Sequence, residues 1–453
     1  MENQKYYDGL NTKLFNAIPV GAKKVLELGC ANGRLGGLYK SENPACNWTG
    51  IDISEEALSC ASKVLDRTFN INLNISNLSR TEDFNSFDTV VIGDLLEHLA
   101  EPEKLLKSLL QVTADDAKII CCLPNMAHIS VIQKIISGDL AYDEMGLMDR
   151  THLKLFSPSS AFKIFLDGGW LPNLVDQYRA DPPKSKFTKI ILQATASLGV
   201  PEKTALRTLG MYQMIVECTK NKYLGCQNKD HPMGVSVVVA VNREWEFDSN
   251  ISQSPGLKEI NAEIIPIRNA KSAAAAFEEG KLRCKNSWIL FAHQDVYIPS
   301  GSGAALIEEL GNFARVNQTT APIGFAGIDL SGENATREAG LVIDRTSLFQ
   351  HEPSRDAISI DEFAVVLHKE SPVKIDSKLG WHTWATDLCL QAYFGKVTHR
   401  ASIINVPMFH NSLNDYSLNK QYRRSALLLS KKYPKLNKIE TLCGVIKRRW
   451  WIF

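Results

Sequence analysis

The chain has 453 residues, of which 44% are hydrophobic and 22% charged, so it holds enough apolar material for two or three globular domains. A formal net charge of +1 argues against the strongly basic surface that is typical of nucleic-acid-binding proteins. Ten scattered cysteines without a CxxC pair, the lack of a recognisable secretion signal and the lack of a membrane-length apolar run predict a cytoplasmic protein with reduced thiols.

The apolar pattern of the first half predicts a doubly wound α/β sheet. Apolar side chains near helical spacing up to about residue 23 predict an entry helix. Strand-like runs then alternate with helical patterns, as they do where crossover helices join parallel strands. We expect strands at residues 25–28, 48–53, 71–75, 89–92 and 119–123, and an antiparallel pair at 174–178 and 212–219 around a helix at 187–198. The ligand site of such a sheet lies beyond the carboxyl ends of its strands.

A glycine-rich turn follows the first strand in KKVLELGCANGRLG. Gly29 and Gly33 let the backbone approach a ligand closely, and the helix behind the turn offers free N–H groups. Asp52 ends the second strand at about the 20-residue separation from which a carboxylate can bind ribose hydroxyls. Glu27 precedes the first glycine, and its charge would repel a pyrophosphate but suits an amine or a sulfonium. The predicted ligand is therefore a nucleoside with a cationic group.

The segments VLELGCANG, GID and SFDTVVIGDLLEHL together resemble the class I S-adenosylmethionine (SAM)-dependent methyltransferases. By this resemblance the glycine turn holds the methionine end of the cofactor, and residues near the next strand ends contact the ribose and adenine. The cofactor-binding residues that it implies are Glu27, Gly29, Cys30, Gly33, Asp52, Ile53, Asn77 and Asp94.

The fourth strand leads into GDLLEHL, where Asp94, Glu97 and His98 would share one face of a helical turn. Acidic residues at a helix start are also favoured by the helix dipole, so a structural role stays open. A distant histidine, His152, lies in DRTHLKLFS, which resembles a segment of sugar and polysaccharide O-methyltransferases with Lys154 in place of their arginine.

The same acid-x-x-Glu-His pattern with a distant histidine resembles the divalent-metal sites of small-RNA 2′-O-methyltransferases and ubiquinone-pathway O-methyltransferases. That resemblance makes Asp94, Glu97, His98 and His152 the candidate metal ligands. A metal-free alternative needs His98 or His152 only as the general base on a hydroxyl, and both alternatives remain open.

A second α/β unit follows a polar linker at 221–233. Apolar runs at 235–242, 264–267 and 288–292 predict strands, and the last of them ends in His293-Gln294-Asp295. A carboxylate paired with an imidazole at a strand end can hold a divalent ion against a diphosphate. SWILFAHQDVYIP resembles GT-A glycosyltransferases, in particular the family-two-like group that includes the streptomycin-biosynthesis-type domain.

The GT-A resemblance implies further site residues. His293, Asp295 and the later His410 would bind manganese or magnesium, and Asp387 in GWHTWATDLCLQAYFGK would be the general base, although it could also be a helix-capping residue. Candidate substrate-binding residues are Asn242, Asn269, Trp381 and His382. Residues 412–433 are expected to be helical.

Taken together, the sequence predicts an α/β protein with a Rossmann-like methyltransferase domain at 1–220, a linker at 221–233, a GT-A domain at 234–435 and a basic, aromatic tail at 436–453. The tail, IKRRWWIF, suits either a peripheral contact with the inner face of the membrane or docking on the protein itself.

The predicted function is that of a bifunctional transferase in polysaccharide or glycoconjugate biosynthesis. SAM would methylate a sugar hydroxyl, and a nucleotide sugar with manganese or magnesium would supply a glycosyl group to a glycan acceptor, lipid-linked or not. The alternative is an O-methyltransferase of RNA or a small molecule, with an inactive GT-A domain as a binding module. Near-zero net charge speaks against nucleic acid as a partner.

Overall fold

The computed structural model describes residues 10–81, 84–223, 233–331, 335–413 and 419–447. The chain divides into two compact units, each built on its own sheet. Unit 1 comprises Met1–Asn221 and Leu413–Asp415, and unit 2 comprises Lys222–Ser412 and Tyr416–Phe453. The break falls at the start of the predicted linker, of which residues 224–232 lie outside the described residues. Each unit is therefore treated by itself.

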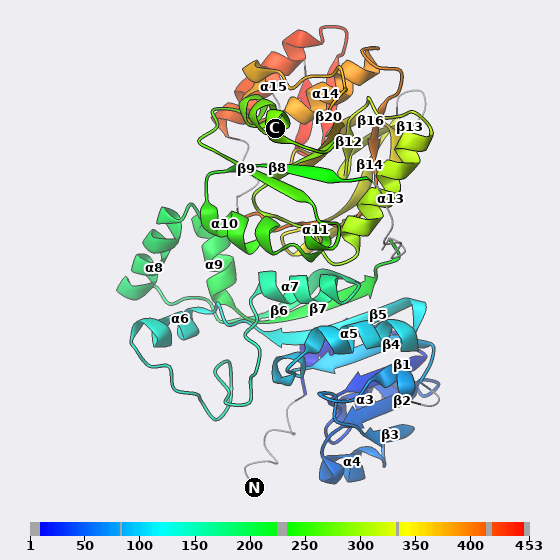
Figure 1. Cartoon of the computed structure of the whole chain (residues 1–453). Coiled ribbons are helices and arrows are strands. Elements are labelled where there is room, and N and C mark those ends of the chain that lie inside the picture. Colours follow the sequence, from blue (N-terminus) through cyan, green and yellow to red (C-terminus); the bar gives the residue numbers. More distant parts are fainter. Residues whose placement is uncertain (1–9, 82–83, 224–232, 332–334, 414–418, 448–453) are drawn as a thin grey trace. The chain divides into compact units, whose positions relative to one another are not determined.

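Unit 1 is a seven-stranded sheet in the order β3-β2-β1-β4-β5-β7-β6 (Figure 1). β1 to β5 are parallel, and β7 runs antiparallel to both β5 and β6. This topology confirms the predicted doubly wound sheet with an antiparallel final pair. The strands are β1 (Lys24–Leu28), β2 (Asn47–Asp52), β3 (Arg67–Asn70), β4 (Phe87–Gly93), β5 (Thr113–Pro124), β6 (Trp170–Arg179) and β7 (Met211–Lys220).

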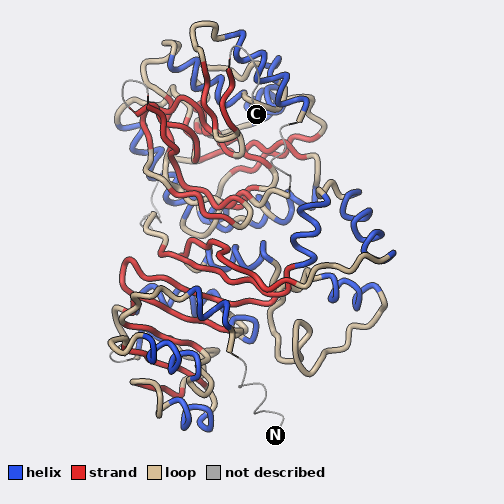
Figure 2. Tube along the Cα trace, turned by 180° about the vertical axis from the view of Figure 1, so that it is seen from behind, coloured by secondary structure: helices blue, strands red, loops and turns tan. Residues whose placement is uncertain are grey.

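Helices lie on both sides of this sheet (Figures 1 and 2). Serines at several helix starts accept a hydrogen bond from a backbone N–H of the first turn, which satisfies a donor that the helix leaves free. The helical segments are α2 (Thr12–Ala17), α3 (Arg34–Glu42), α4 (Glu55–Ala61), η1 (Leu78–Arg80), η2 (Leu96–His98), α5 (Pro102–Val112), α6 (Ile129–Ile136), α7 (Pro158–Asp167), α8 (Lys186–Ser197) and α9 (Glu202–Gly210). Residues 1–9 of the predicted entry helix lie outside the described residues.

The third strand was predicted at 71–75, and this was wrong. β3 is Arg67–Asn70, and Ile75, in the predicted strand, is 83% exposed. β3 is an edge strand of the sheet and pairs only with β2. The hydrogen bonds to this one neighbouring strand are enough to define it as a strand. Its Phe69 packs edge-on against Phe84 at 5.0 Å between ring centroids. Tertiary pairing and one aromatic contact thus outweigh the apolar spacing of the following loop.

Unit 2 is also α/β, with a twelve-stranded mixed sheet in the order β11-β19-β14-β13-β16-β18-β12-β17-β10-β8-β9, to which β15 adds by pairing with β14. The predicted strands at its start are present as β8, β9 and β10. All its strands are β8 (Val235–Val241), β9 (Glu263–Arg268), β10 (Trp288–His293), β11 (Val296–Tyr297), β12 (Ile323–Gly324), β13 (Ala326–Ser331), β14 (Ala335–Asp344), β15 (Ser347–Gln350), β16 (Ser354–Ile360), β17 (Ala364–His368), β18 (Ala401–Ile403) and β19 (Phe409–His410).

The central strands of unit 2 are buried on both faces. Val238 and Phe291 belong to one apolar cluster, whereas Val237 and Leu290 belong to another, as alternating side chains of a covered sheet must. The helical segments that cover the sheet are α10 (Glu244–Ser249), η3 (Ile251–Gln253), α11 (Pro255–Glu259), α12 (Ala273–Arg283), α13 (Ser302–Arg315), η4 (Ser377–Leu379), α14 (Trp384–Tyr393) and α15 (Lys420–Lys432).

The end of the chain forms a small hairpin of β20 (Lys438–Thr441) and β21 (Gly444–Lys447). Ile439 and Ile446 are each 3% exposed and belong to the same apolar cluster as residues of α14 and α15. This part of the predicted tail therefore packs within unit 2. Residues 448–453, which include the tryptophans of the predicted membrane contact, lie outside the described residues. Among the described helices, none has the length and apolarity needed to cross a bilayer.

Candidate functional site

The glycine turn after β1 has the backbone that the sequence predicts. Gly29 and Gly33 have φ angles of 73° and 77°, a region that side chains with a Cβ rarely adopt. A Cβ on Gly33 would also lie 2.9 Å from the Cα of Ala61, so α4 packs directly against the turn. The turn therefore brings backbone to the carboxyl end of β1, where a ligand of this fold would lie.

Asp52 lies at the end of β2 and holds the glycine turn in place. Its Oδ2 accepts a hydrogen bond from the Ala31 N–H at 2.8 Å, and its Oδ1 accepts one from the Ser54 N–H at 2.9 Å. The side chain is half-buried, and each carboxylate oxygen keeps acceptor capacity. Asp52 is thus placed to accept further hydrogen bonds from a ligand hydroxyl at the strand ends.

Glu27 lies in β1 just before the turn and is 6% exposed. Its Oε2 accepts a hydrogen bond from the indole N–H of Trp48 at 2.8 Å. Burial, with a smaller contribution from the charge of Asp52, raises the pKa of Glu27 to about 8 against the effect of that hydrogen bond. A buried carboxyl of this kind is stabilised in its charged form by a cationic ligand.

Three other predicted cofactor residues occupy different positions. Cys30 is buried, and a Cβ on Gly50 would lie 2.7 Å from its Sγ, so its side chain packs behind the turn. Ile53 is 66% exposed. Asn77 is exposed and caps η1, with its Oδ1 accepting from the Ser79 N–H at 3.1 Å. Because β3 ends at Asn70, Asn77 is not at a strand end, which removes the reason for which it was chosen.

The residues after β4 gather at the same edge of the sheet. Asp94 has a φ of 45° and accepts a hydrogen bond from Gln213 Nε2 at 2.7 Å, and burial raises its pKa. Glu97 and His98 follow in a single 3-10 turn, η2. His152 joins them from the loop before α7, with its ring centroid 4.9 Å from that of His98.

Glu97, His98 and His152 each offer one ligand atom, and these atoms all lie within 4.8 Å of one another. Glu97 is 1% exposed, and its Oε2 has no hydrogen-bond partner among the described residues. Burial, and next the charge of Asp94, raise the pKa of Glu97 well above its usual value. Burial also lowers the pKa of His98. The cluster therefore favours an uncharged carboxyl and imidazole until a cation is present.

The loop that carries His152 is attached to this cluster by its backbone. The carbonyl oxygen of Glu97 accepts hydrogen bonds from the N–H groups of Leu153 at 2.7 Å and Lys154 at 3.0 Å. His152 Nδ1 lies 3.0 Å from the Leu147 carbonyl oxygen, and His98 Nδ1 lies 3.2 Å from that of Thr151. These contacts leave the Nε2 atoms of both rings as candidates for contact with a substrate or an ion.

Comparison with known proteins agrees with this geometry. Residues 26–119, from β1 into β5, match a family model described as a methyltransferase domain. Unit 1 therefore contains a stretch that matches methyltransferase domains, within a sheet of the order β3-β2-β1-β4-β5-β7-β6. Its matched stretch holds the glycine turn, Asp52 and the Asp94–His98 segment, whereas His152 comes from outside it.

The ubiquinone biosynthesis O-methyltransferase of Coxiella burnetii is 22% identical over 154 residues, which is 34% of this chain. The match spans 65% of the length of that relative. Among solved structures, a SAM-dependent methyltransferase from Archaeoglobus fulgidus has 19% identity and a TM-score of 0.35, covering 48% of this chain and 98% of that one. The YcgJ protein from Bacillus subtilis has 15% identity and a TM-score of 0.32, covering 47% of this chain and 97% of that one.

Unit 2 has its own cluster of ionisable side chains at the end of β10. His293, Asp295 and His410 offer ligand atoms within 4.8 Å of one another. Pairing of β11 with β19, in which Val296 lies opposite His410, brings this last residue to the cluster. His410 Nε2 lies 3.6 Å from Asp295 Oδ1, and neither atom has a hydrogen-bond partner among the described residues.

Asp344, at the end of β14, is a member of this cluster that the sequence analysis missed. Its Oδ1 lies 3.0 Å from His410 Nδ1 and orients the imidazole. Although burial opposes the charge, Asp295 and Asp344 raise the pKa of His410 to about 9. Only the parallel pairing of β14 with β19 brings Asp344 there, so no local sequence signal could have indicated it.

The middle residue of the His-Gln-Asp segment connects this cluster to β8. Gln294 Oε1 accepts from the N–H groups of Asn242 at 2.8 Å and Arg243 at 3.0 Å, and its Nε2 donates to Asn242 Oδ1 at 2.7 Å. The predicted substrate-binding Asn242 is thus held at the strand end by a side chain. Asn269, after β9, is exposed and has a φ of 60°.

Asp387, the predicted general base, is 0% exposed in the first turn of α14. Its Oδ2 accepts from Gln391 Nε2 at 2.7 Å and Lys432 Nζ at 2.8 Å, and its Oδ1 accepts from the Tyr433 hydroxyl at 2.7 Å. A carboxylate with both oxygens bound and no exposed surface cannot reach a substrate hydroxyl. The predicted role of Asp387 as a base is therefore corrected to a structural one.

Replacing Asp387 with alanine should destabilise unit 2 by about 2–4 kcal/mol, because the buried Gln391, the half-buried Tyr433 and the ammonium of Lys432 all lose their acceptor. Urea unfolding followed by circular dichroism measures this change. Asp376, which pairs with the same Lys432 at 2.8 Å nearer the surface, is the matched control, and its alanine variant should cost less than about 1 kcal/mol. Equal stability of the Asp387 variant and the wild type would contradict the structural role.

Glu362, which follows β16, is an acidic residue that lies at the start of α14. Thr383, Trp384 and Ala385, at the start of α14, donate backbone hydrogen bonds to it. Burial, and next the charge of Asp361, raise its pKa well above the usual value despite these bonds. Its Oε1 has no hydrogen-bond partner among the described residues.

One predicted substrate-binding residue, His382, lies near Glu362. His382 Nδ1 is 4.0 Å from Glu362 Oε2, and the His382 ring packs edge-on against Tyr422 at 5.8 Å between centroids. Trp381 is 36% exposed, so part of its face is free for contact. Asp361-Glu362 could have been noticed as an acidic pair at the end of an apolar alternating run, but only the fold places it at the start of α14.

Proposed function

We propose that unit 1 transfers the methyl group of SAM to a hydroxyl of a sugar or a related small acceptor. The observation that carries this proposal is the buried Glu97 Oε2, without a hydrogen-bond partner among the described residues, beside two imidazoles at the cofactor edge of the sheet. An uncompensated buried carboxyl is costly, and a bound cation or a substrate hydroxyl would offset that cost.

The chemistry is an in-line displacement at carbon. The acceptor oxygen attacks the methyl carbon of the sulfonium, the carbon–sulfur bond breaks, and S-adenosylhomocysteine leaves with the electron pair. The hydroxyl proton goes to a base, for which His98 is suited because burial lowers its pKa and keeps the ring neutral near pH 7. The enzyme otherwise acts by positioning the donor and the acceptor.

The residues of this cluster also fit a divalent metal. Glu97, His98 and His152 supply one carboxylate oxygen and two imidazole nitrogens, a donor set that suits a first-row ion better than magnesium. A bound ion would polarise the acceptor hydroxyl and make it easier to deprotonate. Asp94 is engaged by Gln213 and would orient neighbouring groups rather than act as a ligand.

A methyl-transfer assay with labelled SAM distinguishes a metal-dependent mechanism from one in which a histidine acts as the base. If the cluster holds a metal, EDTA should abolish transfer to hydroxyl acceptors, and added Mn²⁺ should restore it. If the histidines act as bases, EDTA should leave the rate unchanged. A protein that binds S-adenosylhomocysteine but methylates no member of a panel of sugars, phenols and RNA would contradict the proposal.

The acceptor class has two candidates. The resemblance of DRTHLKLFS to sugar O-methyltransferases supports a sugar hydroxyl. The relative named as a ubiquinone biosynthesis O-methyltransferase supports a non-sugar acceptor, at 22% identity. Sugars and phenols in the same panel decide between them.

For unit 2 we propose transfer of a glycosyl group from a nucleotide sugar. His293, Asp295 and His410 would hold manganese or magnesium, and two ligand atoms without hydrogen-bond partners among the described residues fit that role. The ion would neutralise the charge of the leaving diphosphate. The alternative is a binding module without transfer activity, which the structural role of Asp387 supports.

Mn²⁺ binding to unit 2 should strengthen with pH. His410 has a pKa of about 9, so at lower pH the metal must displace its proton, and affinity should rise up to about tenfold per pH unit before levelling off above pH 9. Calorimetric titration at several pH values measures this. Asp295→Asn should weaken binding by about tenfold or more, whereas the exposed control Glu338→Gln should not change it.

Nucleotide-sugar binding can be measured by the same calorimetric titration. A nucleotide sugar should bind the manganese-loaded protein and lose affinity in Asp295→Asn. Slow hydrolysis of the sugar nucleotide would support transfer. Mn²⁺ binding that is unaffected by Asp295→Asn would contradict the assignment of this cluster.

A further inference from the structure

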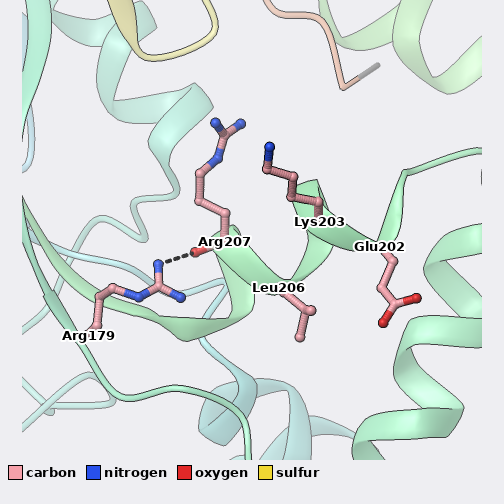
Figure 3. Close-up of a pocket in the computed structure, with 5 residues that line it drawn as sticks. All are labelled: Arg179, Glu202, Lys203, Leu206 and Arg207. Carbon is pink, nitrogen blue, oxygen red and sulfur yellow. Dashed lines mark hydrogen bonds between the residues drawn. The ribbon is translucent and has the colours of Figure 1, made fainter. Parts of the chain in front are cut away.

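A cationic pocket lies on unit 1, and none of its lining residues belongs to the cluster of Glu97 and the two histidines. It has a volume of about 520 Å³ and is lined by Arg179 at the end of β6 and by Glu202, Lys203, Leu206 and Arg207 of α9. Figure 3 shows the Lys203 and Arg207 side chains extending to the same side of α9, while Glu202 points elsewhere. Three of the five lining side chains are cationic.

The two α9 cations are exposed and unpaired among the described residues. Neither the Lys203 ammonium nor the Arg207 guanidinium has a hydrogen-bond or ion-pair partner within the described parts of the chain. Like charges four residues apart on a helix repel each other, and Lys203 stands in the first turn, where the helix dipole disfavours a cation. Residues 182–210 contain five basic and one acidic residue, against 51 and 50 in the whole chain. A bound anion would remove this repulsion.

Arg179 positions this part of the molecule rather than being free for a ligand. Its Nε donates to Asp181 Oδ1 at 3.0 Å, and its Nη1 lies 3.4 Å from the Arg207 carbonyl oxygen. It therefore ties the end of β6 to the last turn of α9 (Figure 3). On its other face α9 buries Ala205 and Leu209 in an apolar cluster with Ile129 and Ile191, so the helix is firmly held.

The pocket lies at the carboxyl edge of the parallel strands, where the methyl donor is proposed to bind. β6 runs parallel to β5, so both end at the same edge. Asn125, directly after β5, is 0% exposed and donates to the carbonyl oxygens of Thr208 and Met211 at 2.8 Å each. His128 Nε2 lies 3.0 Å from the carbonyl oxygen of Ala180, next to Arg179. Residues that follow β5 thus contact both the end of α9 and the segment that follows β6, which places the pocket at the same edge of the sheet as the proposed methyl donor.

We propose that Lys203 and Arg207 bind a phosphate group carried by the methyl acceptor. This inference rests on the methyltransferase function proposed above and names a property of its acceptor. An arginine offers a planar pair of donors to phosphate oxygens, and a nearby lysine adds a mobile charge. The phosphate can belong to a soluble phosphorylated compound or to a lipid-linked one, since the shared chemistry is the same.

Inorganic pyrophosphate is the probe for this site. Calorimetric titration of the full chain in EDTA should show binding to the wild type, and Lys203→Glu with Arg207→Glu should weaken it at least tenfold. The matched control is Lys186→Glu with Lys189→Glu on α8, which makes the same change of charge outside the pocket and should leave binding within about twofold. A milder pair, Lys203→Gln with Arg207→Gln, should give an intermediate loss.

The outcomes separate this proposal from the function on which it rests. S-adenosylhomocysteine affinity should be the same in all these proteins. S-adenosylhomocysteine binding without pyrophosphate binding would show that the phosphate site is wrong and that the methyltransferase function stands. The same conclusion follows if pyrophosphate affinity falls equally in the α8 and α9 variants. If no protein binds S-adenosylhomocysteine, the methyltransferase function fails instead.

A vesicle-sedimentation experiment identifies whether the phosphate belongs to a lipid or to a soluble compound. Phosphatidylcholine vesicles with and without phosphatidylglycerol are sedimented with the wild type and both charge-reversal proteins. Loss of binding to the anionic vesicles only in the α9 variant assigns a lipid phosphate, and no vesicle binding by the wild type assigns a soluble one. Equal loss in the α8 and α9 variants indicates a diffuse basic face and overturns the pocket.

Discussion

Asp52→Asn is expected to weaken the binding of S-adenosylhomocysteine by about a hundredfold, because hydrogen bonds to a charged acceptor contribute roughly 1.5–3 kcal/mol each. Asparagine cannot replace the carboxylate here, since the Ala31 and Ser54 N–H groups each donate to a different oxygen of Asp52. The amide would place an NH₂ group against one of these donors, and it would also offer less to a ribose hydroxyl. Isothermal titration calorimetry measures the loss.

The control for this experiment is Glu56→Gln. Glu56 is an exposed acid in the first turn of α4, close to Asp52 along the chain, and its replacement changes the net charge by the same amount. Cofactor affinity in this variant should stay within about twofold of the wild type. A loss of the same size in both proteins would show that general charge, not the carboxylate at the end of β2, controls binding.

His98→Ala and His152→Ala are each expected to lower the rate of methyl transfer by about 10²–10⁴-fold while leaving S-adenosylhomocysteine affinity nearly unchanged. Both roles proposed for the imidazoles, as base or as metal ligand, act on the acceptor hydroxyl and not on the cofactor. The measurement is the initial rate with saturating labelled SAM, together with a calorimetric titration of the product.

Arg150→Ala is the matched control, since Arg150 is an exposed residue of the loop that carries His152. Its rate should remain within a fewfold of the wild type. Wild-type rates in both histidine variants would remove these residues from the mechanism. If His98 is the base, the wild-type rate should hold steady above pH 6.5 and fall below the pKa of His98, which burial places under its ordinary value.

The sequence was a good guide to the framework of unit 1. Buried parallel strands consist almost wholly of apolar residues, as in β1, where Val25, Leu26 and Leu28 are 0% exposed. The glycine turn and Asp52 could also be predicted from local sequence. Glycine permits the positive φ angles of the turn, and Asp52 comes directly at the end of a strand. β3 could not be found this way, because a polar edge strand is defined by its partner β2 and not by its own pattern.

The candidate sites were less predictable, because they depend on contacts between residues that are distant in the chain. His152 reaches Glu97 through a loop attached to the Glu97 carbonyl oxygen, and Asp344 reaches His410 only through strand pairing. Asp387 illustrates the opposite case. An acid in the first turn of a helix fits a base as well as a structural anchor, and only the positions of Lys432 and Tyr433 decide between them.

The hydrogen bond from the Trp48 indole to Glu27 has a practical consequence. Indole fluorescence responds to a charge placed beside the ring nitrogen, and Trp48 donates to a carboxyl whose pKa is about 8. Titration of the empty protein across that range, and entry of a sulfonium at neutral pH, should both shift its emission. The chain thereby contains an intrinsic optical reporter for a cation that binds beside Glu27, which needs no added label.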